Sequence, residues 1–125
     1  MRGEKVLTEK SFDFATKIVK LCKLLGGDER SAERKELVMS KQLLRSGTCV
    51  GASIREGTVA ESNNDFIHKM SVSLKECKKS MYWIELLHTT GYMTDDEFAS
   101  IQQDAEKLIK MLTKVLADAT KKGLK

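Results

Sequence analysis

Residues 64–90, NDFIHKMSVSLKECKKSMYWIELLHTT, decide the fold of this chain. Through this stretch the steps between apolar residues alternate between three and four, and His88 extends the series at its end. The apolar positions are Ile67, Met70, Leu74, Cys77, Met81 and Ile84. This spacing places all of them on one face of an α-helix. The capping residues of 62–64 precede the stretch and Gly91 follows it. The pattern predicts a long helix over residues 64–90, and its period near 3.5 is typical of helix bundles.

Similar patterns predict three more helices, over residues 8–25, 29–60 and 95–122. In the last of these, the apolar line comprises Phe98, Ile101, Ala105, Leu108, Leu112, Val115 and Ala119. Thr94 and Glu97 have the spacing of a capping box at its start. In the first, the line comprises Phe14, Ile18, Leu21 and Leu25. We expect Gly26-Gly27 to end that helix in a left-handed conformation and Asp28 to cap the next.

The helix over residues 29–60 has the least regular pattern. We expect Leu37, Leu44, Gly51 and Ile54 to form its buried line, with Gly47 one turn before Gly51. Glycine inside a helix costs about 1 kcal/mol relative to alanine. Either this helix bends around residues 45–51, or the glycines let a neighbouring helix approach closely. We favour close approach.

The connections and the composition complete the fold prediction. The chain has 125 residues and no proline, so long helices can run without interruption. The short links at residues 26–29 and 91–94 force neighbouring helices to run in opposite directions. The sequence therefore predicts an all-α fold, an antiparallel up-down four-helix bundle that forms a single domain over residues 1–125.

Some apolar residues lie away from the main apolar lines. They are Trp83, Leu86 and Leu87 in residues 64–90, and Ile109, Met111 and Leu116 in residues 95–122. A monomeric bundle needs one buried stripe on each helix, so the surplus suggests a second contact surface. We expect Trp83, Leu86 and Leu87 to form a homo-oligomer interface. The alternative is that these residues belong to a thick core.

No motif predicts catalysis, a metal or a cofactor. Residues 47–51, Gly-Thr-Cys-Val-Gly, have the shape of a nucleophile elbow with Cys49 as nucleophile, but that motif requires a strand before the turn. Packing of small residues between helices is the better interpretation. We expect His68 to be solvated and His88 to close the end of an apolar stripe with a hydrogen bond. Neither histidine has metal-ligand spacing, and we expect no enzyme activity.

Four charged residues are candidates for an interhelical polar network: Arg45, Glu56, Glu76 and Glu85. Paired carboxylates between helices can also hold two metal ions. Di-iron bundles use Glu-x-x-His pairs, however, and this chain has none. We expect ion pairs or hydrogen bonds that fix the register of the helices.

Basic residues are more clustered than the net charge of +4 suggests. Lys17, Lys20 and Lys23 form one cluster without an acidic residue among them. Arg30, Arg34, Lys41 and Arg45 form a band along the next helix. Such bands can neutralise phosphates, so all seven are candidate nucleic-acid-binding residues. The alternative is an ordinary solvated face.

The cysteines and the hydropathy of the sequence indicate the cellular compartment in which we expect the protein. Cys22, Cys49 and Cys77 are odd in number and have no Cys-x-x-Cys spacing, which suits free thiols in a reducing cytoplasm. Residues 1–5 lead into mixed polar sequence, so we expect no secretory signal. No apolar run reaches the length of a membrane span, so we expect no membrane partner.

Three blocks of sequence resemble one bacterial family. They are residues 42–56 (QLLRSGTCVGASIRE), residues 65–76 (DFIHKMSVSLKE) and residues 82–87 (YWIELL). Together they resemble the four-helix-bundle proteins named for intervening sequences in 23S ribosomal RNA genes, over residues 12–116. Cys49 and Ser53 stand where the family commonly has serine and asparagine, so a polar network shared at these two positions is in doubt.

The resemblance implies a homo-oligomer, a pentamer of bundles. A related branch, the accessory proteins of diversity-generating retroelements, implies basic pentamers that bind nucleic acid and a reverse transcriptase. The first hypothesis is therefore a non-enzymatic, oligomeric accessory protein that binds RNA or DNA. The second is a structural or protein-interaction module without a nucleic-acid role.

Overall fold

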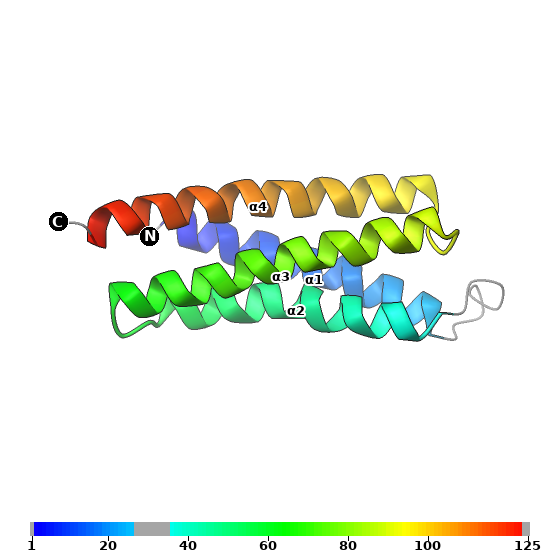
Figure 1. Cartoon of the computed structure of the whole chain (residues 1–125), viewed down its shortest axis with the longest axis horizontal. Helices are drawn as coiled ribbons and strands as arrows, with labels where there is room; N and C mark the ends of the chain where they lie inside the picture. Colours follow the sequence, from blue (N-terminus) through cyan, green and yellow to red (C-terminus); the bar gives the residue numbers. More distant parts are fainter. Residues whose placement is uncertain (1, 27–35, 124–125) are drawn as a thin grey trace.

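Four α-helices follow one another in the computed structural model, which describes residues 2–26 and 36–123. They are α1 (Arg2–Leu25), α2 (Val38–Thr58), α3 (Asn63–Thr89) and α4 (Asp95–Gly123). Consecutive helices run side by side in alternating directions (Figure 1). The described residues contain no strand, so the prediction of an all-α fold with four helices is confirmed. The bounds of α3 and α4 agree with the predicted ones to within one residue.

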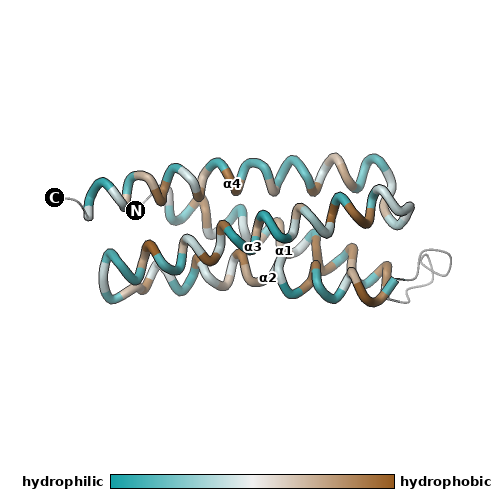
Figure 2. Tube along the Cα trace, viewed as in Figure 1, coloured by the Kyte–Doolittle hydropathy of each residue, from teal (hydrophilic) through white to brown (hydrophobic). Residues whose placement is uncertain are grey.

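The helices pack as a closed ring of four neighbours. α2 packs against α1 and α3, and α4 closes the ring between α3 and α1, whereas no Cα atoms of the diagonal pairs come within 8 Å of each other in the described residues. Brown, hydrophobic positions recur along every helix and alternate with teal ones (Figure 2). The largest fully buried side chains come from all four helices: Leu7, Phe14, Ile18, Leu25, Leu43, Val50, Ile54, Met70, Ile84, Leu87, Leu108 and Leu112.

The helix α1 begins at Arg2, six residues before the predicted start at Thr8. Leu7 is completely buried, and Ser11 is 1% exposed, so the buried line continues from Phe14 back through both residues. Because Ser11 is polar, the spacing of apolar residues did not indicate that the buried line extends beyond Phe14 towards the start of the helix. The Ser11 hydroxyl donates a hydrogen bond to the Thr8 carbonyl oxygen, which satisfies it inside the helix.

The helix α2 begins later than expected. The predicted start at residue 29 and the expected cap at Asp28 lie outside the described residues, whereas Glu36 and Leu37 are described and are not helical. The Glu36 carboxylate accepts hydrogen bonds from the backbone N–H of Val38 (3.1 Å) and of Ser40 (2.9 Å). A glutamate thus satisfies the first free N–H groups of α2, where a carboxylate is also favoured by the helix dipole.

The buried face of α2 differs from the predicted one. Leu37 and Leu44 are 42% and 38% exposed, so the expectation that both are buried was wrong. The buried line consists of Ser40, Leu43, Ser46, Gly47, Val50, Ser53, Ile54 and Gly57. Five of these eight residues are serine or glycine, so a prediction from hydropathy assigned the wrong face of α2 to the core.

The prediction of close approach at Gly47 is confirmed. A Cβ atom on Gly47 would lie 3.0 Å from both γ carbons of Ile18 on α1. A Cβ atom on Gly51 would lie 3.4 Å from the Ser11 hydroxyl oxygen, at ordinary contact distance. The helix continues through both glycines from Val38 to Thr58, so these small residues let α1 lie close to an unbroken α2.

Local signals fix the ends of α3 and α4. The Ser62 hydroxyl accepts a hydrogen bond from the Asp65 N–H at 3.0 Å. Thr94 and Glu97 form the predicted capping box, with reciprocal hydrogen bonds of 2.9 and 3.1 Å. Gly91 ends α3 with a φ of 89°, a conformation that glycine adopts without strain. Gly26 does not adopt such a positive φ, contrary to expectation, and Gly27 lies outside the described residues.

Serines fill the contact between α2 and α3. Ser46 and Ser53 on α2 and Ser73 and Ser80 on α3 are each at most 4% exposed. The hydroxyl oxygens of Ser80 and Ser46 lie 2.9 Å apart, and the Ser73 hydroxyl donates to the Val50 carbonyl oxygen at 2.8 Å. On each helix the two serines are seven positions apart, which places both on the same face of that helix.

Candidate nucleic-acid interface

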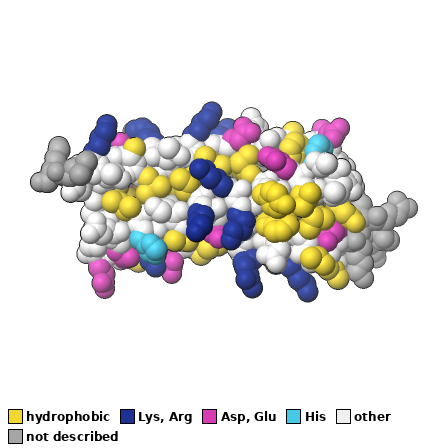
Figure 3. All heavy atoms as spheres, in the orientation of Figure 1, with side chains coloured by type: hydrophobic (Ala, Val, Ile, Leu, Met, Phe, Trp, Pro, Cys, Tyr) yellow, Lys and Arg dark blue, Asp and Glu magenta, His cyan; other side chains and the backbone are white. Residues whose placement is uncertain are grey.

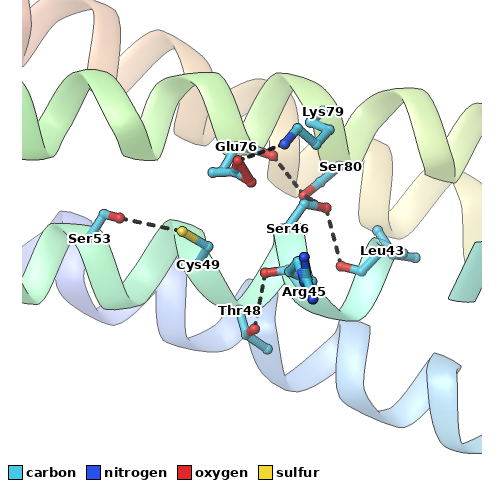
Figure 4. Close-up of polar contacts among 9 residues, drawn as sticks. All are labelled: Leu43, Arg45, Ser46, Thr48, Cys49, Ser53, Glu76, Lys79 and Ser80. Carbon is cyan, nitrogen blue, oxygen red and sulfur yellow. Dashed lines mark hydrogen bonds and ion pairs between the residues drawn. The ribbon is translucent and has the colours of Figure 1, made fainter. Parts of the chain in front are cut away.

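The residues of the possible nucleophile motif lie inside α2. Cys49 is half-buried, and its Sγ atom lies 3.6 Å from the Ser53 hydroxyl oxygen on the next turn (Figure 4). A nucleophile elbow needs a sharp turn from a strand into a helix. Residues 47–51 are helical throughout and lack that turn, so this motif packs helices together.

The two other cysteines differ in burial, since Cys77 is buried and Cys22 is half-buried. The Cys22 thiol donates to the Ser40 carbonyl oxygen at 3.3 Å, and the Cys77 thiol to the Ala105 carbonyl oxygen at 3.6 Å. Burial raises the pKa of Cys22 to about 11 and the pKa of Cys77 to about 12. These two thiols are therefore protonated at neutral pH and poor nucleophiles.

The histidines take up separate positions. His68 is exposed on α3, as expected. His88 hydrogen-bonds through Nε2 to the Asp95 carboxylate at 2.7 Å, and its ring stacks on Phe98 with 4.0 Å between centroids. His88 therefore makes a hydrogen bond at the end of the apolar stripe, as we predicted, and this bond also joins the end of α3 to the start of α4. Within residues 2–26 and 36–123, no three His, Cys, Asp or Glu residues come together as metal ligands.

The predicted network of Arg45, Glu56, Glu76 and Glu85 does not form. None of the hydrogen bonds or ion pairs among the described residues joins two of these four. Glu56 instead pairs with Lys69 across α2 and α3 at 3.7 Å, and Glu76 pairs with Lys79 one turn along α3 at 2.9 Å (Figure 4). The serine hydroxyls described above occupy the contact where we expected charged side chains.

The predicted interface residues are largely part of the chain's own core. Leu87 is completely buried, so its assignment to an oligomer interface was wrong. Trp83 is half-buried against the core, and its Nε1 atom is buried without a hydrogen-bond partner among the described residues. Leu86 is half-buried. The surplus residues Ile109, Met111 and Leu116 also pack against the core, as the thick-core alternative proposed.

Exposed apolar side chains gather instead on α1 and at the start of α2. Apart from Val59 and Tyr82, all the exposed large apolar residues in the described part of the chain lie there: Val6, Phe12, Val19, Leu37, Val38 and Leu44. A groove of about 620 Å³ runs between α1 and α2, with Phe12, Ala15, Val19 and Ala52 among its lining residues. We call it the α1–α2 groove. The Arg55 guanidinium lies over the Phe12 ring at 5.3 Å, within the range of a cation–π contact.

The predicted basic residues do not form one surface. Lys17 is engaged with α4, 2.7 Å from the Asp104 carboxylate and 2.8 Å from the Ser100 hydroxyl. Lys20 and Lys23 are exposed beside the α1–α2 groove, and Lys41 is exposed on α2. Arg30 and Arg34 lie outside the described residues. Arg45 is exposed, and its side chain forms no hydrogen bond or ion pair with a described residue.

Three lysines on α3 complete a basic surface that our sequence prediction missed. Lys75, Lys78 and Lys79 are exposed on α3, and Arg45 is exposed on the adjacent α2, where Figure 4 shows its side chain. We call these four residues the basic face. Figure 3 shows lysine and arginine side chains gathered near the middle of the face in view. The spacing of residues 75, 78 and 79 places them opposite the buried line of α3, a signal that the sequence already contained. Lys75 and Lys78 pair with no described carboxylate.

The fold and this surface define a small helical-bundle protein with a basic face. The family model of the 23S rRNA-intervening sequence protein matches residues 4–114, and the chain belongs to this family. The resemblance drawn from the three sequence blocks is thereby confirmed.

A solved structure supports the same assignment. The crystal structure of a protein of unknown function from the S23 ribosomal protein family of Bacteroides thetaiotaomicron VPI-5482 is similar, with a TM-score of 0.85 and 43% sequence identity. The similarity covers 92% of this chain and 98% of that one. No curated protein matches the sequence. None of the helices in the described residues has both the length and the apolar character needed to cross a bilayer.

Proposed function

We propose that this chain is a non-enzymatic, homo-oligomeric accessory protein that binds RNA or DNA through its basic face. The observation that carries the proposal is a set of four exposed basic residues on two neighbouring helices, Arg45 on α2 and Lys75, Lys78 and Lys79 on α3. The carboxylate of Glu76 among them is 15% exposed and already paired with Lys79. The exposed charge of this face is therefore positive.

Phosphate groups are the natural ligands of such a face. Lysine and arginine side chains that neutralise phosphates release condensed counterions, which makes binding favourable and strongly dependent on salt. The cations lie on rigid, well-packed helices, so they hold a fixed spacing. Contacts of this kind position a nucleic acid without reading its sequence.

Self-association would multiply this charge. The α1–α2 groove presents apolar side chains to solvent, and the family resemblance implies a pentamer. We propose that this groove, rather than Trp83 and Leu86, forms the contact between copies. Five copies of a chain with net charge +4 would carry about +20, and repeated basic faces would engage one strand at several points. The free thiols of Cys22, Cys49 and Cys77 suit a cytoplasmic location.

One observation favours the alternative, a protein-interaction module without a nucleic-acid role. The lining of the α1–α2 groove combines apolar residues with Lys20, Lys23 and Arg55 and contains no carboxylate. An amphipathic acidic helix of another protein, including a reverse transcriptase, would fit such a groove.

Paired charge reversals test nucleic-acid binding. The variant Lys75→Glu/Lys78→Glu removes two cations of the basic face, and Lys107→Glu/Lys110→Glu makes the same charge change on exposed positions of α4. We expect the first variant to weaken binding about 10-fold or more and to lower the salt dependence, because fewer phosphates are neutralised. The second should have the smaller effect. Fluorescence anisotropy with labelled RNA and DNA at several salt concentrations measures both, after circular dichroism has shown that each variant is folded. Equal effects of the two variants would contradict a defined basic face.

Light scattering tests the assembly. Val19→Glu places a charge in the α1–α2 groove, and Val59→Glu places one at an exposed position outside it. We expect a particle several times 14.1 kDa that only Val19→Glu dissociates. A wild-type monomer at micromolar concentration would refute the homo-oligomer.

A further inference from the structure

Tyr82 extends the basic face with an aromatic ring. It is 59% exposed, and it follows Lys78 by four residues and Lys79 by three, so it lies on the same side of α3 one turn further along. Figure 3 shows hydrophobic side chains gathered over α3 next to lysine and arginine side chains. Apart from Phe12, Tyr82 is the only exposed aromatic side chain in the described residues.

The Tyr82 ring rests against one neighbouring ring, that of Trp83. It contacts the Trp83 ring edge to face, with 5.1 Å between centroids and 74° between planes. Trp83 in turn packs against the core, so it gives Tyr82 a fixed neighbour. Phe12 differs, because the Arg55 guanidinium already lies over its ring. Tyr82 thus combines a held ring with a large exposed area.

We propose that Tyr82 is a stacking platform for an unpaired nucleotide base, and that Lys75, Lys78 and Lys79 contact the neighbouring phosphates. Residues 75 and 82 are seven positions apart, or about 10.5 Å along the helix axis, so the ring and the lysines can act on one short strand. The inference rests on the proposed function and specifies its ligand, a single-stranded nucleic acid.

The chemistry favours a single strand over a duplex. A duplex presents phosphates to the lysines, but its bases are stacked on one another and offer no free face to Tyr82. An unpaired base offers its π-face, and aromatic stacking together with lysine–phosphate contacts is the usual way that proteins bind single strands without sequence preference. A purely apolar partner would gain nothing from the three lysines beside the ring.

Binding of labelled oligo(dT), oligo(U) and a mixed-sequence DNA duplex, measured by fluorescence anisotropy, tests the proposal. We expect Tyr82→Ala to weaken binding of both single strands about fivefold or more, which is the lower end of the loss seen for a stacked base. Tyr82→Phe should bind as the wild type does, because it keeps the ring. The duplex should bind Tyr82→Ala and the wild type equally. Val59→Ala, which removes an exposed apolar side chain outside both the basic face and the α1–α2 groove, should leave the single-strand affinity unchanged.

A second readout uses Trp83, the only tryptophan in the chain. A base stacked on the adjacent Tyr82 should change the fluorescence of Trp83 on addition of oligo(dT), and the change should be lost in Tyr82→Ala. Unchanged single-strand affinity in a folded Tyr82→Ala variant would overturn the stacking platform and leave the basic face intact. A smaller particle mass for Tyr82→Ala would also overturn it, since Tyr82 would then belong to a contact between copies. Failure of the wild type to bind any of the three probes would overturn the proposed function as well.

Discussion

Substitution of Gly47 and of Gly51 by alanine should change the stability of the bundle in opposite directions. Both glycines lie inside α2, where alanine is intrinsically better than glycine by about 1 kcal/mol. At Gly51 the new Cβ would meet the Ser11 hydroxyl at 3.4 Å, an ordinary contact. We therefore expect Gly51→Ala to raise the free energy of unfolding by about 0.5–1 kcal/mol.

Gly47 has no such space. Its Cβ would lie 3.0 Å from both γ carbons of Ile18, and a β-branched side chain in a helix has essentially one χ1 rotamer, so it cannot turn away. Overpacking of this kind costs about 1–3 kcal/mol. After the gain in helix propensity, Gly47→Ala should lower the free energy of unfolding by about 1 kcal/mol. The difference between the two variants should be about 1–3 kcal/mol, and helix propensity cancels from it.

Denaturant unfolding followed by far-UV circular dichroism, at equal protein concentration, measures both variants. Ile18→Ala removes the two γ carbons, so the clash should be absent from the double variant Ile18→Ala/Gly47→Ala. We expect a favourable coupling energy between the two substitutions of about 1 kcal/mol or more. If Gly47→Ala stabilises the protein as much as Gly51→Ala does, the packing of α1 on α2 is not as close as this reasoning requires.

Two further predictions concern the thiols and a helix end. Because burial raises the pKa of Cys22 to about 11 and that of Cys77 to about 12 from 9.0, the unfolded chain loses these protons first, and stability should fall as the pH rises above about 9. Below that pH these thiols add no pH dependence to the stability. Cys77→Ala should make the free energy of unfolding fall less steeply with pH between about pH 8 and about pH 11. An unchanged dependence on pH would contradict the raised pKa of Cys77. Thr94→Ala removes the acceptor for the Glu97 N–H and should cost about 1 kcal/mol in thermal or denaturant unfolding, whereas Thr113→Ala on the exposed side of α4 should cost less; equal costs would contradict the capping role.

The sequence predicted α3 and α4 well because their core positions are apolar and evenly spaced. Ile101, Leu108 and Leu112 are buried as expected, and Thr94 and Glu97 cap α4 as expected. The prediction from sequence failed for α2, because serine and glycine occupy much of its buried line while Leu37 and Leu44 face solvent. Buried serines satisfy their hydroxyls with nearby carbonyl oxygens, so hydropathy gives no sign that they are inside. A search for small residues seven apart would have found Ser46 with Ser53 and Ser73 with Ser80.

The candidate site was only partly predictable for a related reason. Arg45 was predicted and lies on the basic face, but Lys17 is held by Asp104, a pairing across α1 and α4 that depends on the register of the folded bundle. Lys75, Lys78 and Tyr82 could have been found from their common side of one helix. The assignment of Leu87 to an interface failed because α3 contacts two helices, so its buried arc is wider than one apolar line.

The serine-lined contact between α2 and α3 has a consequence for how the bundle opens. Among the four neighbouring pairs in the described residues, α2 and α3 share the most extensive contact and α1 and α4 the least, with Lys17 and Asp104 bridging the latter pair from the surface. Serine also loses little rotamer freedom on burial, so the α2–α3 contact forms at a small entropic cost. The bundle is therefore a central hairpin of α2 and α3 with an outer helix on each side. We expect amide protons of α2 and α3 to exchange most slowly with solvent, and the bundle to open first along the line where α1 meets α4.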